Sequence, residues 1–198
     1  SALQVALRIL EVGNGDEVVV PTLTFIAPIN SVIYNNAKPI FMDCDDFYNM
    51  DVEKTIKFIK NETVFRNNFT FNKKTKKRIP AILPVHLWGN AAKLERLVKI
   101  CKERNISIVE DAAESFGTKY TNGNLKNRFT GTIGKVGCLS FNGNKIITTG
   151  GGGMILTNNQ KLAKKAKYLI NQAKDNPLTY ICNDIGYNFR LTNIQAAL

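Results

Sequence analysis

The feature that most constrains the fold of this chain is an alternation of short apolar runs with helix-like segments. Runs of strand-like residues occupy 17–21, 38–43, 81–85, 107–110 and 138–141. Apolar residues at helical spacing, which predict helices, occur over 1–10, 25–35, 52–60, 91–104 and 160–171. This alternation predicts an α/β fold with a mostly parallel sheet covered by helices. Right-handed crossovers place ligands at the carboxyl ends of such strands.

The charge of the chain is unevenly distributed. The formal net charge is +11, and much of it comes from residues 73–78 and from four lysines within 161–167. No aromatic residues interleave with these lysines as stacking platforms would, so we interpret them as a basic loop and a solvated helix face. A nucleic-acid surface is the alternative. The same charge could attract an anionic substrate such as a nucleotide sugar. Residues 66–78 are predicted to form a loop or insertion.

Two further patterns concern the cellular location of the protein and the state of its cysteines. No apolar stretch has the eighteen or more residues of a membrane span, and we expect no membrane association and a cytoplasmic location. The cysteines show no CxxC or metal-ligand spacing, which predicts reduced, buried thiols and no metal site. They are Cys44, Cys101, Cys138 and Cys182.

The segment from Ser140 to Lys145, followed by the glycine run 150–153, carries the clearest chemical signal. A serine five residues before a lysine, after a strand-like lead-in, can hold a phosphate while the lysine holds an aldehyde. A lysine in a pocket is a nucleophile toward carbonyl groups rather than a solubilising charge. Asp111 follows Ile108 and Val109 at the predicted end of a strand, where ligands bind in α/β folds.

Several longer segments occur in a fixed order: GDEVVVPTLTFIAPINSV from Gly15, KPIFMDCD from Lys38, PVHLWGN from Pro84, IVEDAAESFGTKY from Ile108, LSFNGNKIITTGGGGM from Leu139 and GYNFRLTNIQAAL from Gly186. With these segments, nearly the whole chain resembles the large domain of the sugar aminotransferases of the DegT/DnrJ/EryC1/StrS family. These are pyridoxal-phosphate enzymes of fold type I.

The resemblance implies two catalytic residues. Lys145 matches the lysine that bonds to the cofactor and then moves the proton between substrate and cofactor. Asp111 matches the carboxylate that lies against the pyridine nitrogen and keeps it protonated, so that the ring can act as an electron sink.

The resemblance also implies the remaining cofactor contacts. Ser140 matches the hydroxyl that binds the phosphate, and Ser1 lies in the phosphate-binding turn at the start of the first helix. Phe25 matches an aromatic residue that stacks on the ring. Glu114 matches a variable position near the other ring face, and its role is left open. Asn188 matches a residue that reaches the phosphate of the neighbouring subunit in a homodimer.

Other positions are interpreted more simply or depart from the family. His86, the single histidine, is interpreted as structural. Phe25 has a core residue as its alternative interpretation. All four positions of 150–153 are glycine, where the family often has a glutamate. Lys145 argues against the relatives that carry histidine there and act as dehydratases.

The predicted function is amination of a nucleotide-linked 4-keto-6-deoxy sugar, specifically an acetamido sugar for surface glycans, with glutamate as donor. The NGNKIITTGGGG and LWGN segments resemble the bacillosamine and legionaminic-acid subgroup. We expect 1–198 to be one large domain, truncated at both ends and inactive alone. The alternatives are a sugar dehydratase or deoxygenase of the same fold, or a non-catalytic regulatory homologue.

Overall fold

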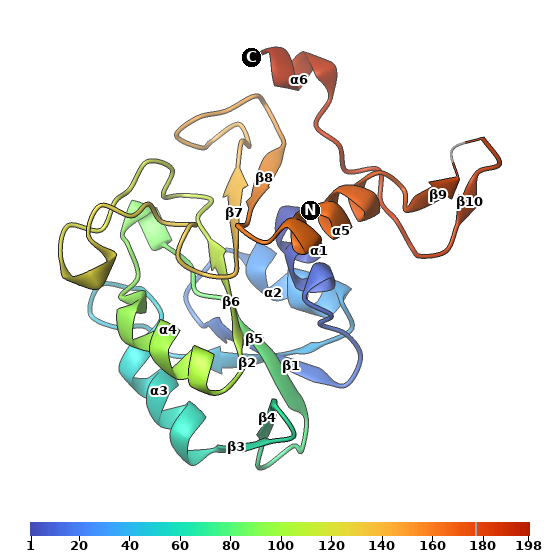
Figure 1. Ribbon diagram of the computed structural model, residues 1–198. Helices are drawn as coiled ribbons and strands as arrows, with labels where there is room; N and C mark the ends of the chain where they lie inside the picture. Colours follow the sequence, from blue (N-terminus) through green and yellow to red (C-terminus); the bar gives the residue numbers. More distant parts are fainter. Residues whose placement is uncertain (177) are drawn as a thin grey trace.

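The sheet at the centre of the molecule has eight strands, six of them in the order β2-β1-β5-β6-β7-β8 (Figure 1). The computed structural model describes residues 1–176 and 178–198. The first five strands of this path run parallel to their neighbours, and β8 is antiparallel to β7. Their bounds are β2 (Lys38–Met42), β1 (Asp16–Pro21), β5 (Arg78–Ile82), β6 (Ser107–Asp111), β7 (Val136–Ser140) and β8 (Gly153–Leu156). The predicted α/β fold class is therefore confirmed.

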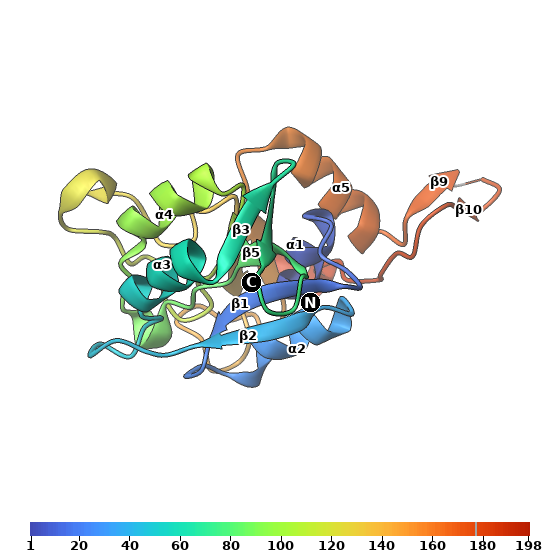
Figure 2. The same cartoon turned by 90° about the horizontal axis from the view of Figure 1, so that it is seen from below.

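Helices cover both faces of the sheet. Figures 1 and 2 show α3 (Val52–Asn61) and α4 (Leu94–Glu103) on one side, with α1 (Ala2–Ile9) and α5 (Gln160–Ile170) on the other. The helix α2 (Ile26–Tyr34) packs against α1. Among the described residues, no helix combines the length and apolar character needed to cross a membrane.

Residues along β1 show why the strands are apolar throughout. Val18 and Val20 belong to the core beneath α1 and α5, whereas Val19 belongs to the core beneath α3 and α4. All three are fully buried. Successive side chains of a strand point to opposite faces, so a strand covered on both faces has no solvent-facing position.

Side-chain caps mark the starts of α3 and α5. The side chain of Asp51 accepts a hydrogen bond from Lys54 N at the start of α3. Asn159 accepts from the backbone of Lys161 and Leu162 at the start of α5. Such caps satisfy N–H groups that have no partner within the helix. The predicted helices are confirmed, with ends displaced by at most a few residues.

The prediction of a loop over 66–78 is wrong. A hairpin of β3 (Thr63–Arg66) and β4 (Phe69–Asn72) lies there, and β4 joins the edge of β5. Asn67 and Asn68, between the two strands, have φ of 50° and 63°. A two-residue turn with both residues at positive φ matches the twist of a hairpin, and asparagine tolerates that conformation. Besides this two-residue turn, only the lysine-rich part of the segment, between β4 and β5, lies outside the strands.

The strand predicted over 81–85 is displaced, because β5 starts at Arg78 and ends at Ile82. Pro84 has no N–H to donate to a neighbouring strand, which explains the early end. The chain nevertheless stays beside the sheet, since Val85 forms a parallel bridge with Asp111.

The remaining elements are short. They are the one-turn helices η1 (Leu87–Gly89) and η2 (Gly123–Leu125), the hairpin of β9 (Lys174–Asn176) and β10 (Ile181–Cys182), and α6 (Asn193–Ala197). The helix α6 begins with a capping box of Thr192 and Gln195. All four cysteines are free thiols, as expected, but the expectation that they are buried is wrong for two of them: Cys44 is partly exposed and Cys182 is exposed.

Candidate functional site

A large cavity opens at the carboxyl ends of β6 and β7. Its volume is about 1040 Å³. Every residue implicated from the sequence lines it, although these residues come from widely separated parts of the chain: Ser1, Phe25, Asp111, Glu114, Ser140, Lys145 and Asn188. The fold therefore brings all seven positions together around one space.

Lys145 lies in the connection between β7 and β8. Its backbone N–H donates to Asn142 O at 3.0 Å, which closes a turn that directs the chain back toward the cavity. The Nζ atom lies 3.6 Å from Glu114 Oε1 and 5.2 Å from the centre of the Phe25 ring. The side chain is only 13% exposed. A sheltered amine between a carboxylate and an aromatic face is well placed to meet a carbonyl group.

Phe25 is not a core residue. It directly precedes α2 and is 62% exposed, with its ring turned to the cavity beside Lys145. The alternative interpretation of Phe25 as core packing is therefore wrong. A large apolar ring left uncovered at a cavity wall is suited to stacking on a flat ligand.

Asp111 ends β6 and is only 6% exposed. One carboxylate oxygen accepts a hydrogen bond from Ala113 N at 3.0 Å. Burial raises the pKa of Asp111, and the Ala113 hydrogen bond and the charge of Lys145 offset this only in part. A buried carboxylate with a raised pKa favours a cationic N–H partner, because such a partner would stabilise its ionised form.

Ser140 and the start of α1 form the polar side of the cavity. Ser140 is the last residue of β7. Its hydroxyl oxygen accepts a hydrogen bond from Asn142 N at 3.3 Å, which leaves the hydroxyl proton available to a ligand. Ser1 precedes α1, and no side chain caps the first backbone N–H groups of that helix. Unpaired N–H groups at a helix N-terminus favour an anion, and phosphate is a common one.

Asn188 reaches the cavity from the C-terminal part of the chain. It forms an antiparallel bridge with Asn171, directly after α5, and Arg190 donates to its side-chain oxygen at 3.4 Å. The sequence implies a role for Asn188 toward a neighbouring subunit, whereas in the single chain it lines the same cavity as the other six residues.

The residues present fit pyridoxal phosphate, the cofactor implied by the sequence. Asp111 offers a buried anion for a protonated ring nitrogen, and Phe25 offers an uncovered face for the ring. Lys145 would supply the amine for the aldehyde, and Ser140 with the start of α1 would supply donors for the phosphate. Each part of this cofactor thus has a chemically matched group in one cavity.

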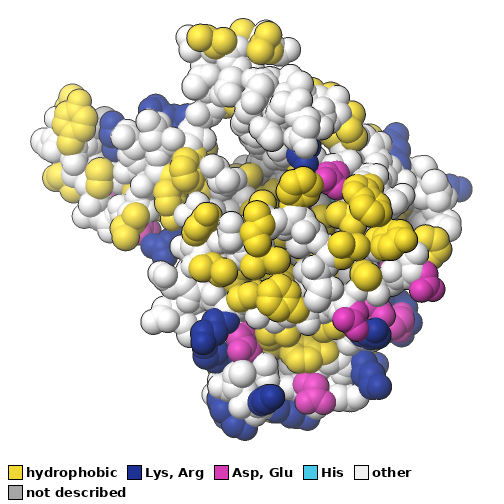
Figure 3. Space-filling model, turned by 180° about the vertical axis from the view of Figure 1, so that it is seen from behind, with side chains coloured by type: hydrophobic (Ala, Val, Ile, Leu, Met, Phe, Trp, Pro, Cys, Tyr) yellow, Lys and Arg dark blue, Asp and Glu magenta, His cyan; other side chains and the backbone are white. Residues whose placement is uncertain are grey.

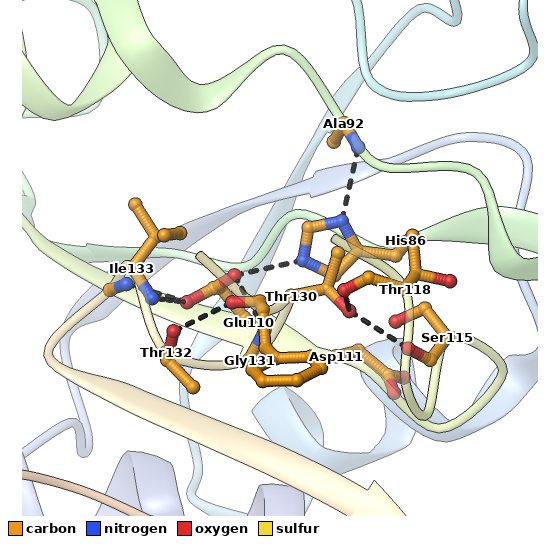
Figure 4. Close-up of polar contacts among 12 residues, drawn as sticks. His86, Ala92, Glu110, Asp111, Ser115, Thr118, Thr130, Gly131, Thr132 and Ile133 are labelled. Atoms are coloured by element: carbon orange, nitrogen blue, oxygen red, sulfur yellow. Dashed lines mark hydrogen bonds and ion pairs between the residues drawn. The ribbon is translucent and has the colours of Figure 1, made fainter. Parts of the chain in front are cut away.

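Sequence inspection missed two features around the cavity. Trp88 N donates to Glu114 Oε2 at 2.8 Å from a left-handed backbone with φ of 52°. Beneath Asp111, Glu110 and His86 form a fully buried pair, drawn in Figure 4. The second feature had a signal, because a glutamate inside an otherwise apolar strand must find partners when it is buried. His86 is fully buried and pairs with Glu110 rather than lining the cavity.

The fold and the cavity together define an α/β protein with a site whose residues fit pyridoxal phosphate. The family model of the DegT/DnrJ/EryC1/StrS aminotransferase family matches residues 1–198, and the chain belongs to this family.

Three comparisons illustrate the similarity. The chain is 40% identical to GDP-perosamine synthase of Escherichia coli O157:H7 over 197 residues, covering all of this chain and 49% of that protein. It is 38% identical to EpsN of Bacillus subtilis (strain 168), described as an inferred pyridoxal phosphate-dependent aminotransferase, covering all of this chain and 47% of that protein. A DegT DnrJ EryC1 StrS aminotransferase from Brucella abortus superimposes with a TM-score of 0.85 at 35% identity, covering 99% of this chain and 49% of that one. The chain thus spans about half the length of the relatives it matches.

Proposed function

We propose that the protein containing this chain is a pyridoxal-phosphate aminotransferase that converts a nucleotide-linked 4-keto-6-deoxy sugar to the 4-amino sugar. The convergence of Lys145, Asp111 and Ser140 on one cavity carries this proposal. Membership of an aminotransferase family supports the reaction class. The similarity to an enzyme named GDP-perosamine synthase supports a nucleotide sugar as substrate.

The bound cofactor would supply an electron sink for the substrate carbon that gains or loses a proton. Lys145 would hold the cofactor, and its amine would then carry the proton to and from that carbon. Asp111 would keep the ring nitrogen protonated, and Ser140 would anchor the phosphate at the opposite end. Glu114 would hold the Lys145 amine in place after the amine has released the cofactor and while it carries the proton.

We propose glutamate as amino donor, and an acetamido sugar of the bacillosamine or legionaminic-acid type, on the basis of the NGNKIITTGGGG and LWGN segments. The net positive charge of the chain would favour encounter with an anionic nucleotide sugar. A panel of GDP- and UDP-linked keto sugars with different amino donors would test each of these choices.

We also propose that the protein works as a cytoplasmic homodimer. The helix α2 borders the cavity and exposes Ile26, Ile33 and Tyr34, each more than half exposed. Figure 3 shows hydrophobic side chains gathered on the face of the molecule seen from behind. Apolar side chains concentrated beside a site are typical of a surface that is covered by another chain. Sedimentation of the intact protein would test this.

We propose that residues 1–198 form the cofactor-binding large domain. The relatives are about twice as long, so groups that bind the donor carboxylate and the sugar nucleotide would lie outside this chain. The chain expressed alone is accordingly expected to show no turnover. Full transaminase activity of the isolated chain would contradict this part of the proposal.

The experiment that tests the function is borohydride reduction of the intact protein after incubation with pyridoxal phosphate, followed by peptide mass mapping. The expected result is one pyridoxyl adduct, on Lys145, in a sample shown by circular dichroism to be folded. An adduct spread over several surface lysines, or none in a folded sample, would refute the cofactor assignment. Product analysis then separates amination from dehydration of the same sugar.

A further inference from the structure

Glu110 is a buried carboxylate that takes no part in the cavity. It precedes Asp111 on β6, and neighbouring residues of a strand point to opposite faces of the sheet. Asp111 lines the cavity, whereas the Glu110 side chain is directed to the other face and is 0% exposed. His86 beside it is also 0% exposed. A charged group so deeply buried is costly unless hydrogen bonds satisfy it.

The Glu110 carboxylate accepts four hydrogen bonds (Figure 4). One oxygen accepts from His86 Nε2 at 2.9 Å and from Gly131 N at 2.8 Å. The other accepts from Ile133 N at 2.6 Å and from Gly134 N at 2.5 Å. Both oxygens are therefore fully engaged, and three of the four donors belong to the loop that leads into β7.

The hydrogen bonds of His86 determine which nitrogen carries its proton. His86 Nδ1 accepts a hydrogen bond from Ala92 N at 3.0 Å, so the ring proton is on Nε2 and points to Glu110. Burial by itself would raise the pKa of Glu110, but the His86 hydrogen bond and the N–H groups of Gly134 and Gly131 lower it below its usual value. The pair is thus a neutral imidazole donating to an ionised carboxylate.

The backbone on either side of this pair is tied to the cavity. His86 N donates to Asp111 O at 3.0 Å, and Asp111 N donates to Pro84 O at 2.9 Å. The loop held by Glu110 lies directly on β7, because a Cβ on Gly137 would be 1.9 Å from Gly131 O. The strand β7 ends at Ser140. Glu110 therefore connects the chain segments that carry Asp111 and Ser140.

We propose that Glu110 and His86 are positioning residues that fix Asp111 relative to Ser140, and so fix the separation of the ring-nitrogen site from the phosphate site. The inference rests on the proposed function, because Asp111 is a ring-nitrogen site and Ser140 a phosphate site only if the protein binds pyridoxal phosphate. An apolar side chain would fill the same space without desolvating a charge. Four directional hydrogen bonds add what apolar packing lacks, a defined position for the loop and for both strand ends.

The test compares two isosteric changes of buried glutamates, Glu110→Gln and Glu17→Gln, in the intact protein. Glu17 lies on β1 and is also buried, and it accepts from Asn72 Nδ2 at 2.8 Å and Thr75 Oγ1 at 3.0 Å. In Glu110→Gln an amide NH₂ faces backbone N–H donors, which disturbs the loop. The Kd for pyridoxal phosphate, from absorbance titration, is expected to rise at least about tenfold in Glu110→Gln and to stay within about threefold in Glu17→Gln.

A second readout does not depend on turnover. The pH dependence of the absorption of the bound cofactor reports the environment of its ring, which Asp111 would set. It is expected to shift in Glu110→Gln and not in Glu17→Gln, even when thermal unfolding shows equal losses of stability. Unchanged Kd and unchanged pH dependence in Glu110→Gln would overturn the proposal. Absence of pyridoxal phosphate binding by the unmodified protein would instead refute the proposed function on which it rests.

Two changes at His86 decide the matter if Glu110→Gln does not fold. His86→Gln places an amide NH₂ near the Nε2 position and keeps a donor for Glu110, whereas His86→Asn places its amide near Nδ1 and loses that donor. The proposal predicts a Kd within about threefold of the unmodified value for His86→Gln, and an increase of at least about tenfold for His86→Asn. Equal Kd values for the two variants would overturn it.

Discussion

Glu114 joins the Lys145 amine to the protein backbone: one carboxylate oxygen lies 3.6 Å from Lys145 Nζ, and the other accepts a 2.8 Å hydrogen bond from Trp88 N. The position of the amine in the cavity therefore depends on a main-chain group of a different segment. Both side chains are less than one-fifth exposed, so the ion pair is only partly screened by solvent.

The Glu114→Gln change tests this connection. The amide oxygen can still accept from Trp88 N, but the ion pair with Lys145 is lost. We expect kcat of the intact protein to fall on the order of fivefold, because a partly exposed pair contributes up to about 1 kcal/mol. The matched control is Glu95→Gln, since Glu95 also accepts from a backbone N–H, that of Asn124, away from the cavity. Equal activity of the two variants would contradict the prediction.

Two replacements of Lys145 distinguish the role of its positive charge from its role as a nucleophile. Lys145→Ala and Lys145→Arg are both expected to lose the borohydride-dependent adduct, since neither side chain forms an imine, and to lower turnover by at least about 10²-fold. Lys145→Arg keeps a cation opposite Glu114 and should fold normally. Peptide mapping and circular dichroism on the same samples check both statements. An adduct of unchanged yield in either variant would show that another lysine is the nucleophile.

Asp111→Asn is expected to improve folding while impairing cofactor binding. Burial raises the pKa of Asp111, so the folded protein holds this proton more tightly than the unfolded chain does. Stability without cofactor therefore falls as pH rises from the usual aspartate range through the raised pKa, and the loss is complete above it. The asparagine variant lacks this loss and should unfold at a higher temperature at neutral pH. Calorimetry from pH 4 to pH 8 without cofactor checks the stability, and a titration of the Kd for pyridoxal phosphate checks the binding. A lower unfolding temperature of Asp111→Asn than of the unmodified protein at neutral pH would refute the prediction.

Glu110 should give the opposite pH dependence. Although burial opposes it, the hydrogen bonds from His86, Gly134 and Gly131 lower the pKa of Glu110. Its contribution to stability is therefore present above the usual glutamate range and is lost as pH falls through the lowered pKa. Glu110→Gln is expected to cost about 2–3 kcal/mol at neutral pH and to flatten the acid side of the stability curve. Urea unfolding at a series of pH values measures this. Parallel curves of the free energy of unfolding against pH for Glu110→Gln and the unmodified protein would contradict it.

The hairpin of β3 and β4 offers a test of backbone strain. Asn68 has φ of 63°, a conformation that costs a β-branched residue about 1–2 kcal/mol. Asn68→Val should therefore destabilise the protein by about that amount, whereas Asn68→Gly should be neutral or slightly stabilising. Denaturant midpoints of the intact protein measure both changes. An equal effect of the two substitutions would show that the turn geometry is not what limits stability here.

Sequence patterns predicted most of the sheet because its strands are short, apolar and buried on both faces, as Val18, Val19 and Val20 illustrate. The β3–β4 hairpin was missed because the segment 66–78 is polar and basic, and its turn signal is confined to the short pair Asn67 and Asn68.

The cavity residues were predicted because the segments that carry them resemble those of the family. Only Asp111, Ser140 and Lys145 were also indicated by their residue types and their placement. Contacts such as Glu110 with Gly131, or Glu114 with Trp88 N, were not accessible. They join segments more than twenty residues apart through main-chain groups, and a main-chain N–H carries no mark in the sequence.

The left-handed turn at Trp88 has a consequence for how this protein can diversify. Its N–H serves Glu114, while its indole points away and is 65% exposed, against Tyr48. Any residue other than proline that accepts this conformation can supply the same donor. The exposed side chain at position 88 can thus change in the course of evolution while the hydrogen bond that holds Glu114 is kept.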